Sequence, residues 1–219
     1  MKKIILSLVF GIMSLVSFAQ VFTCEKLQND VEKYKQIQKK YKNSGNKIWS
    51  KELFKEFPCH DDGTITYEYI LKSDSIFNIE DLHTNILNWC KVRCPINSPI
   101  EITSNNHISS TYTLTNVGRA IGYMNATFIN AKGETTVDIK ENRIKVVVKI
   151  LLYMSGNTWN GAEVVLPGSC FPCNPNGSQK DSHAMAFINC HFNSLDIVQS
   201  LMKHLNDNIS TIQNGEDEW

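Results

Sequence analysis

The fold is decided by the stretch that begins with Thr64-Ile-Thr-Tyr-Glu-Tyr-Ile-Leu71 and ends with Arg143-Ile-Lys-Val-Val-Val-Lys-Ile-Leu-Leu-Tyr153. Apolar and polar residues alternate in both segments, which is typical of a strand that is buried on one face. The side chains expected to face the core are Ile65, Tyr67, Tyr69 and Leu71 in the first segment and Ile144, Val146, Val148 and Ile150 in the second. Lys145 and Lys149 are expected to point the other way.

A helix is predicted to follow the first of these strands, from Ile79 to about Cys94. Asn78 is a favourable N-cap, and the acidic residues that follow it suit the positive end of the helix dipole. Pro95 prevents the helix from continuing. The predicted buried stripe consists of Ile79, Leu82, Ile86, Trp89 and Cys90. Trp89, the largest of them, is expected to anchor the core rather than to contact a ligand.

Strand-like segments fill the interval between this helix and the last strand. They are Pro99–Thr103, His107–Thr115, Gly122–Ile129 and Thr135–Lys140. A turn is expected at Asn130–Gly133, and the two-residue loop Glu141-Asn142 predicts a hairpin between the last two strands. One strand, one helix and then consecutive strands predict an α+β fold, in which helices cover one face of an antiparallel sheet.

Two parts of this stretch resemble a known family. They are Ile76-Phe-Asn-Ile-Glu-Asp-Leu82, which leads to Asn88-Trp89, and Thr136-Val-Asp-Ile-Lys-Glu-Asn-Arg-Ile-Lys-Val146. They are similar to secreted proteins of unknown function from Bacteroidetes-type bacteria, over about residues 64–153. The resemblance implies a curved sheet of the TATA-binding-protein-like (TBP-like) fold and an envelope location. It supplies no catalytic residues, and the family's Asp-Gly-Arg turn is replaced here by Glu141-Asn142-Arg143.

The first 19 residues are predicted to be a secretory signal peptide. Lys2 and Lys3 precede a mostly apolar run from Ile4 to Phe18, and Ser17-Phe18-Ala19 supplies small residues for cleavage. The run is short for a membrane span, and the alternative is a buried N-terminal helix. We therefore expect the chain to cross the inner membrane and to be periplasmic or extracellular.

Composition limits the partners of the exported chain. Cleavage after residue 19 removes two of the 22 basic residues and none of the 22 acidic ones, which leaves a net charge of about −2. Such a chain has no basic surplus with which to attract nucleic acid or acidic lipid. No later run is long and apolar enough to predict a membrane span. About 200 residues suffice for one core with appendages.

Residues 20–60 are predicted to be an N-terminal helical segment. From Cys24 to about Lys42, apolar residues recur every three or four positions: Leu27, Val31, Tyr34, Ile37 and Tyr41. This narrow stripe predicts a surface helix packed on the domain, with a coiled-coil helix as the alternative. A second short helix is expected at Ile48–Phe57. The following His60-Asp61-Asp62-Gly63 could suggest a metal or hydrolase site, but Asp-Gly is ordinary turn chemistry and we expect a turn.

The domain is expected to occupy residues 61–155 and to be completed by a C-terminal helix within 183–212. Between them, residues 156–182 form a loop rich in cysteine, proline and glycine, and such long irregular segments are often functional. Residues 184–193 fit either a strand or a helix. Asn193 or Ser194 could cap a helix that carries Leu195, Val198, Leu201, Met202 and Leu205. Residues 213–219 are an acidic tail.

All seven cysteines follow the signal peptide, and an oxidising compartment favours disulfides between them. Cys170-Phe-Pro-Cys173 is the one motif with redox potential, since two thiols at this spacing occur in thioredoxin-like enzymes. No helix start is predicted close behind it and no βαβ context precedes it. A structural disulfide, or pairing with other cysteines, is therefore the favoured interpretation.

Other cysteine arrangements remain open. Cys190-His191 could join the Cys170–Cys173 pair in a zinc site, but adjacent side chains diverge on a strand or helix, and secretion favours oxidation. Cys90 and Cys94 lie one helical turn apart, within disulfide range but poorly oriented. Pairing with Cys59 or Cys24 is equally compatible, because spacing does not determine connectivity.

The sequence predicts no catalytic site. It contains no nucleophile elbow, phosphate loop, zinc-protease motif or dinucleotide fingerprint, and no residue pattern calls for a metal or other cofactor. We expect an exported, non-enzymatic envelope protein that binds a small ligand or another envelope protein. The alternative is a thiol–disulfide redox protein that uses Cys170 and Cys173.

Overall fold

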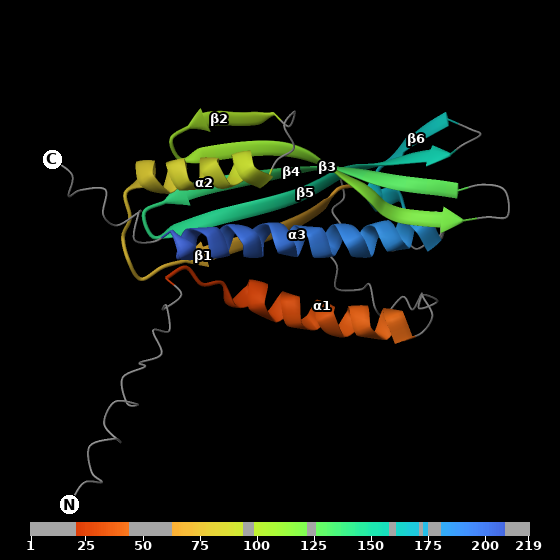
Figure 1. Cartoon of the computed structure of the whole chain (residues 1–219), viewed down its shortest axis with the longest axis horizontal. Coiled ribbons are helices and arrows are strands. Elements are labelled where there is room, and N and C mark those ends of the chain that lie inside the picture. Colours follow the sequence, from red (N-terminus) through yellow and green to blue (C-terminus); the bar gives the residue numbers. More distant parts are fainter. Residues whose placement is uncertain are drawn as a thin grey trace, which may run out of the picture.

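A computed structural model describes residues 21–43, 63–93, 99–121, 126–157, 161–170, 173–174 and 181–208. Within these ranges lie three α-helices, a short 3-10 helix and a six-stranded antiparallel sheet (Figure 1). The elements are α1 (Glu25–Asn43), β1 (Ile65–Lys72), α2 (Ile79–Arg93), β2 (Ile100–Ser104), β3 (His107–Ile121), β4 (Ala126–Lys140), β5 (Arg143–Asn157), β6 (Gly161–Val165), η1 (Pro167–Ser169) and α3 (Asp181–Asp207). The predicted α+β class is confirmed.

The strands follow the order β1-β5-β4-β3-β2. β1 and β6 lie one after the other along the same edge of β5, since β1 pairs with residues 143–150 and β6 pairs with residues 153–157. The predicted hairpin is confirmed, because Lys140 pairs with Arg143 around the Glu141-Asn142 turn. In Figure 1, α2 and α3 lie over one face of the sheet, and α1 runs beside α3.

The alternating pattern of β1 and β5 determines which face of the sheet is buried. The inward residues of β5, Ile144, Val146, Val148 and Ile150, are each 0% exposed. Their neighbours on β1 are equally enclosed, since Tyr67 pairs with Val148 and Tyr69 with Val146. Lys145 and Lys149 lie on the opposite, partly exposed face, as predicted. Each fully buried aliphatic side chain contributes about 1.5–3 kcal/mol to folding.

Helix α3 runs without interruption for 27 residues and includes residues 184–193, which are therefore helical. Small buried side chains such as Ala184 and Ala186 allow it to lie close to the sheet. The approach is tightest at Gly118 of β3, where an added Cβ would lie 2.2 Å from the carbonyl oxygen of Ser182. Only glycine fits at this position.

The predicted helix start at Asn193 or Ser194 is wrong, because both residues lie inside α3. Ser194 is 0% exposed, and its hydroxyl donates to the carbonyl oxygen of Cys190 one turn earlier, at 2.8 Å. A serine can satisfy its hydroxyl in this way within a helix as well as at a cap. The preference of serine for helix N-caps therefore could not distinguish a cap from a position inside the helix.

The turn predicted at Asn130–Gly133 is also wrong. These residues continue β4, which runs for 15 residues beside β3 and β5. Gly133 serves another purpose there, since an added Cβ would lie 2.4 Å from the ring of Tyr112 on β3. The glycine makes room for a cross-strand aromatic ring, and the irregularity in the strand is a register shift between Lys132 and Gly133.

Strand β6 lies in the segment that was predicted to be loop. It is five residues long and presents the apolar side chain of Val164 to solvent, 62% exposed. Five residues are too few to show a clear alternation of apolar and polar residues in the sequence. The strand forms because it pairs with β5, and the local sequence does not reveal this pairing.

The N-terminal helix α1 packs along α3 and the β1 edge. Leu27, Tyr34 and Ile37 of its predicted stripe are buried. Tyr69 of β1 donates to a carboxylate oxygen of Asp30 at 2.8 Å, and Thr23 forms a β-bridge with Lys72. The surface helix expected from the apolar stripe is therefore present.

Several predictions concern residues outside the described ranges. These are the signal peptide at residues 1–19, the second helix at 48–57, the turn at 60–62, Cys59, Cys94 and the acidic tail at 213–219. Within the part of the chain that the structure describes, no helix has the length and apolarity needed to cross a membrane.

Candidate functional site

A pocket of about 290 Å³ lies between helices α2 and α3 and the inner face of β3 and β4. Its walls are formed by Trp89, Arg93, Ser110, Tyr112, Thr113, Leu114, Thr135, Asn193 and Ile197. In Figure 1, α2 and α3 lie over the same face of the sheet, and α2 contacts both α3 and strands β3 and β4. Aromatic and aliphatic groups therefore share the walls with hydroxyl and amide groups and one guanidinium.

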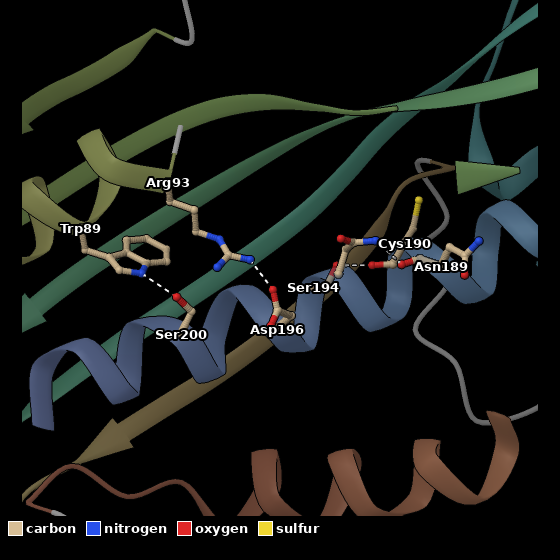
Figure 2. Close-up of polar contacts among 8 residues, drawn as sticks. Trp89, Arg93, Asn189, Cys190, Ser194, Asp196 and Ser200 are labelled. Atoms are coloured by element: carbon tan, nitrogen blue, oxygen red, sulfur yellow. Dashed lines mark hydrogen bonds and ion pairs between the residues drawn. The ribbon is translucent and has the colours of Figure 1, made fainter. Parts of the chain in front are cut away.

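Trp89 fixes α2 against α3 at one side of the pocket. It is 6% exposed, and its indole Nε1 donates to the hydroxyl of Ser200 at 3.0 Å (Figure 2). The structure thus places the predicted core anchor in the interior, and also gives it a polar partner and a share in a pocket wall. A buried indole usually finds such a partner for its N–H group.

Arg93 extends from the last turn of α2 toward α3. Its guanidinium lies 5.9 Å from the centroid of the Trp89 ring and 2.5 Å from a carboxylate oxygen of Asp196. Figure 2 shows the side chain reaching from α2 to Asp196 on α3. The side chain of Arg93 is 32% exposed, whereas that of Asp196 is 67% exposed. The cation therefore stands at the solvent end of the pocket, with its counter-ion on the outer surface.

Two hydroxyl residues form the floor. Ser110 of β3 pairs with Thr135 of β4, and they are 4% and 3% exposed. Both occupy inward positions, where the neighbouring strand residues Ile108 and Val137 are apolar. This break in an apolar pattern is the signal by which sequence reasoning could have found the pocket, and it was missed.

A second buried cluster lies between α3, α1 and the strands. The ring of His191 makes edge contacts with Tyr34 and Tyr67, at centroid distances of 3.6 and 4.7 Å. Burial, and to a smaller extent the charge of Lys33, lowers the pKa of His191 to about 3. His191 is therefore neutral at physiological pH.

Burial also raises the pKa of the neighbouring Cys190 thiol and that of the Tyr153 phenol well above their ordinary values. Such a set of neutral groups suits a polar core better than nucleophilic catalysis, which requires an accessible thiolate or base.

The predicted Cys170–Cys173 disulfide is absent. Cys24, Cys90, Cys170 and Cys190 carry buried thiols, whereas Cys173 is disulfide-bonded, so its partner is not Cys170. Cys170 is 3% exposed and lies 3.9 Å from the hydroxyl of Ser169. Among the described residues, no group of three or more His, Cys, Asp or Glu side chains could hold a metal ion.

An open antiparallel sheet with helices on one face defines the TBP-like class of folds. A TBP-like protein from Parabacteroides distasonis has a similar structure, with a TM-score of 0.50 and 14% identity over 68% of this chain and 96% of that chain. A DUF4468 family protein from Bacteroides ovatus gives a TM-score of 0.43 and 10% identity over 66% of this chain and 90% of its own.

No family model and no curated protein matches the sequence. The TBP-like fold that the sequence resemblance implied is confirmed by the likeness to the TBP-like protein from Parabacteroides distasonis. At these identities the likeness concerns the fold alone, and fold does not determine function.

Proposed function

We propose that this chain is an exported, non-catalytic binding protein and that the pocket between α2, α3 and the sheet is its ligand site. The observation that carries the proposal is the combination of a 290 Å³ space with mixed walls of aromatic, aliphatic and hydroxyl side chains. Ligand sites in proteins are concave and mostly apolar, with a few polar groups that orient the ligand. The pocket lies near the lower end of their usual volume range of about 300–1,000 Å³, which suits a small molecule.

A pocket-filling variant tests this site. A neutral bicyclic probe, 1-naphthylacetamide, is expected to bind the wild-type chain in calorimetric titrations. Leu114→Trp should abolish the signal, because a larger side chain occupies the space. Leu114→Met, which nearly conserves volume, should preserve it. Equal binding to the wild-type chain and to Leu114→Trp, or no binding of this probe or of its carboxylate analogue 1-naphthylacetate to the wild-type chain, would overturn the assignment.

The export part of the proposal rests on the signal-peptide features of residues 1–19. Expression of the full chain with subsequent cell fractionation should give a protein outside the cytoplasm whose intact mass corresponds to a start at Gln20. A full-length protein that stays in the cytoplasm would contradict this assignment, and the pocket would then bind a cytoplasmic ligand.

Thiol–disulfide exchange by Cys170 and Cys173 is the alternative function. A reactive cysteine needs access to its substrate, and the burial of Cys170 disfavours this role. An insulin-reduction assay distinguishes the two functions. We expect turnover at the uncatalysed rate for the wild-type chain. Robust turnover that is lost in Cys173→Ser would establish the redox function instead.

A further inference from the structure

Arg93 gives the pocket a chemical preference that its volume alone does not. Among the described residues that line the pocket, Arg93 is the one that carries a full charge. Its guanidinium carbon lies 5.9 Å from the centroid of the Trp89 ring, a distant cation–π contact that leaves its N–H groups available as donors. A guanidinium in this position favours an anion, above all a planar carboxylate that it can bind through two parallel hydrogen bonds.

The present counter-ion of Arg93 is exchangeable. Asp196 belongs to the surface of α3, and two thirds of its side chain is exposed. Ion pairs with an exposed partner contribute little to stability, because water solvates the Asp196 carboxylate well when the pair separates. A ligand carboxylate that also buries an apolar body gains more than Asp196 loses, and can therefore take its place on the guanidinium.

The rest of the pocket defines the body of the ligand. An apolar cavity of about 150 Å³ holds a benzene molecule, so 290 Å³ accommodates roughly twice that bulk. Trp89 and Tyr112 supply aromatic surface, and Leu114 and Ile197 supply aliphatic surface. Ser110 and Thr135 offer hydroxyl groups at the floor, which suit a polar substituent on an otherwise apolar ligand.

We propose that the pocket binds small organic carboxylates with an aromatic or aliphatic body, and that Arg93 exchanges Asp196 for the carboxylate of the ligand. This inference rests on the proposed function of the pocket. It assigns Arg93 as the specificity-determining residue and Asp196 as an internal competitor. It predicts opposite effects for the loss of each charge, which a purely structural ion pair would not produce.

The test compares 1-naphthylacetate with its neutral isostere 1-naphthylacetamide by calorimetry. Hydrogen bonds to charged groups contribute about 1.5–3 kcal/mol, so the wild-type chain should bind the carboxylate about 10- to 100-fold more tightly. Arg93→Gln should reduce this preference to within about twofold, because it weakens carboxylate binding far more than amide binding. Arg93→Lys should retain part of it, because a lysine supplies the charge without the planar fork.

Asp196→Asn is the matched variant with the opposite expectation. Removal of the competing carboxylate should tighten carboxylate binding by about twofold to fivefold without affecting the amide. Thermal melts of each variant check that the helices still pack. If Arg93→Gln unfolds the chain, its loss of carboxylate preference is not counted. The preference of Arg93→Lys is then compared with that of the wild-type chain instead.

The failures of the two proposals are distinguishable. Equal binding of carboxylate and amide would overturn the carboxylate inference and leave the pocket as a ligand site. A preference that survives Arg93→Gln, or that Asp196→Asn weakens, would also overturn the inference. Binding of neither probe to the wild-type chain would overturn the proposed site itself. Carboxylate binding that persists in Leu114→Trp would place the anion elsewhere and contradict both.

Discussion

Trp89 acts at the residue scale as both a core side chain and a link between helices. We expect Trp89→Ala to lower the free energy of unfolding by about 3–5 kcal/mol, through lost burial and the cavity left behind. Ser200→Ala should cost about 1 kcal/mol, because it removes one hydrogen bond and leaves the indole buried. Denaturant unfolding of the three chains measures both changes. A loss below about 1 kcal/mol for Trp89→Ala would mean that the indole is not buried.

His191 predicts a pH dependence with a definite sign. Its pKa is lowered in the folded chain to about 3, from an ordinary value near 6.5. Below pH 6.5 the unfolded chain takes up a proton that the folded chain does not, so stability falls as the pH decreases toward 3. The contribution is about 1.4 kcal/mol for each pH unit in this window.

The matched variant for this prediction is His191→Phe, which keeps a ring between Tyr34 and Tyr67. Urea unfolding at pH 7, 5.5 and 4.5 should show a shallower loss of stability for the variant, because its remaining decline comes only from other groups. Identical slopes for the two chains would show that His191 is protonated or solvated in the fold.

Single residues were predictable from the sequence only where a local pattern placed them. The position of Trp89 follows from helical spacing within α2. The inward hydroxyls Ser110 and Thr135 are visible as exceptions to a strand pattern, though only in retrospect. The contact between Arg93 and Asp196 joins residues 103 positions apart, so no local signal could reveal it. The pocket depends on this kind of non-local contact.

At the scale of elements, two glycines test whether α3 lies directly against the sheet, because one contacts its backbone and the other contacts nothing. We expect Gly118→Ala to destabilise the fold by about 1–3 kcal/mol, because the added Cβ meets the backbone of α3, which cannot rotate away. Gly156→Ala is the control, since an added Cβ there meets nothing within 4 Å. Its unfolding free energy should change by less than about 0.5 kcal/mol. Thermal or denaturant melts that rank the two variants in the reverse order would contradict the α3–sheet contact.

Elements with a strong internal period were predictable, and those that depend on distant partners were not. The alternation in β1 and β5, and the capping and spacing of α2, specify their own structure. The first half of α3, residues 184–192, is mostly apolar on all sides, so its sequence shows neither a clear helical nor a clear strand period. The length of β4 was underestimated because Gly133 indicates a turn locally, whereas tertiary packing under Tyr112 accounts for it.

At the scale of the whole molecule, the TBP-like fold invites a comparison with DNA-binding saddles, which the charge distribution does not support. On the face of the sheet opposite the helices, Lys145 pairs with Glu68 at 3.0 Å, and His107 lies 2.6 Å from Asp138. Binding to nucleic acid is driven by several unpaired cations that neutralise phosphates. We therefore expect no measurable affinity for DNA or RNA at physiological salt.

Fluorescence anisotropy with labelled mixed-sequence duplex and single strands measures this affinity. Micromolar or tighter binding that weakens steeply as salt increases would contradict the prediction. Glu68→Gln makes this test more stringent, because it removes the acidic partner of Lys145 from the open face. Binding should still be undetectable, because Glu134 and Asp138 remain on that face.

The central claim is that the space between α2, α3 and the sheet is a ligand site, and the indole N–H signal of Trp89 tests it most directly. The chain has four tryptophans, and Trp89→Phe assigns the relevant signal in a two-dimensional proton–nitrogen NMR spectrum. Titration with 1-naphthylacetamide should shift the Trp89 signal in a saturable way, together with the backbone amides of Tyr112, Leu114 and Ile197. Saturable shifts confined to other tryptophans and other surfaces, with the Trp89 signal unchanged, would contradict the account.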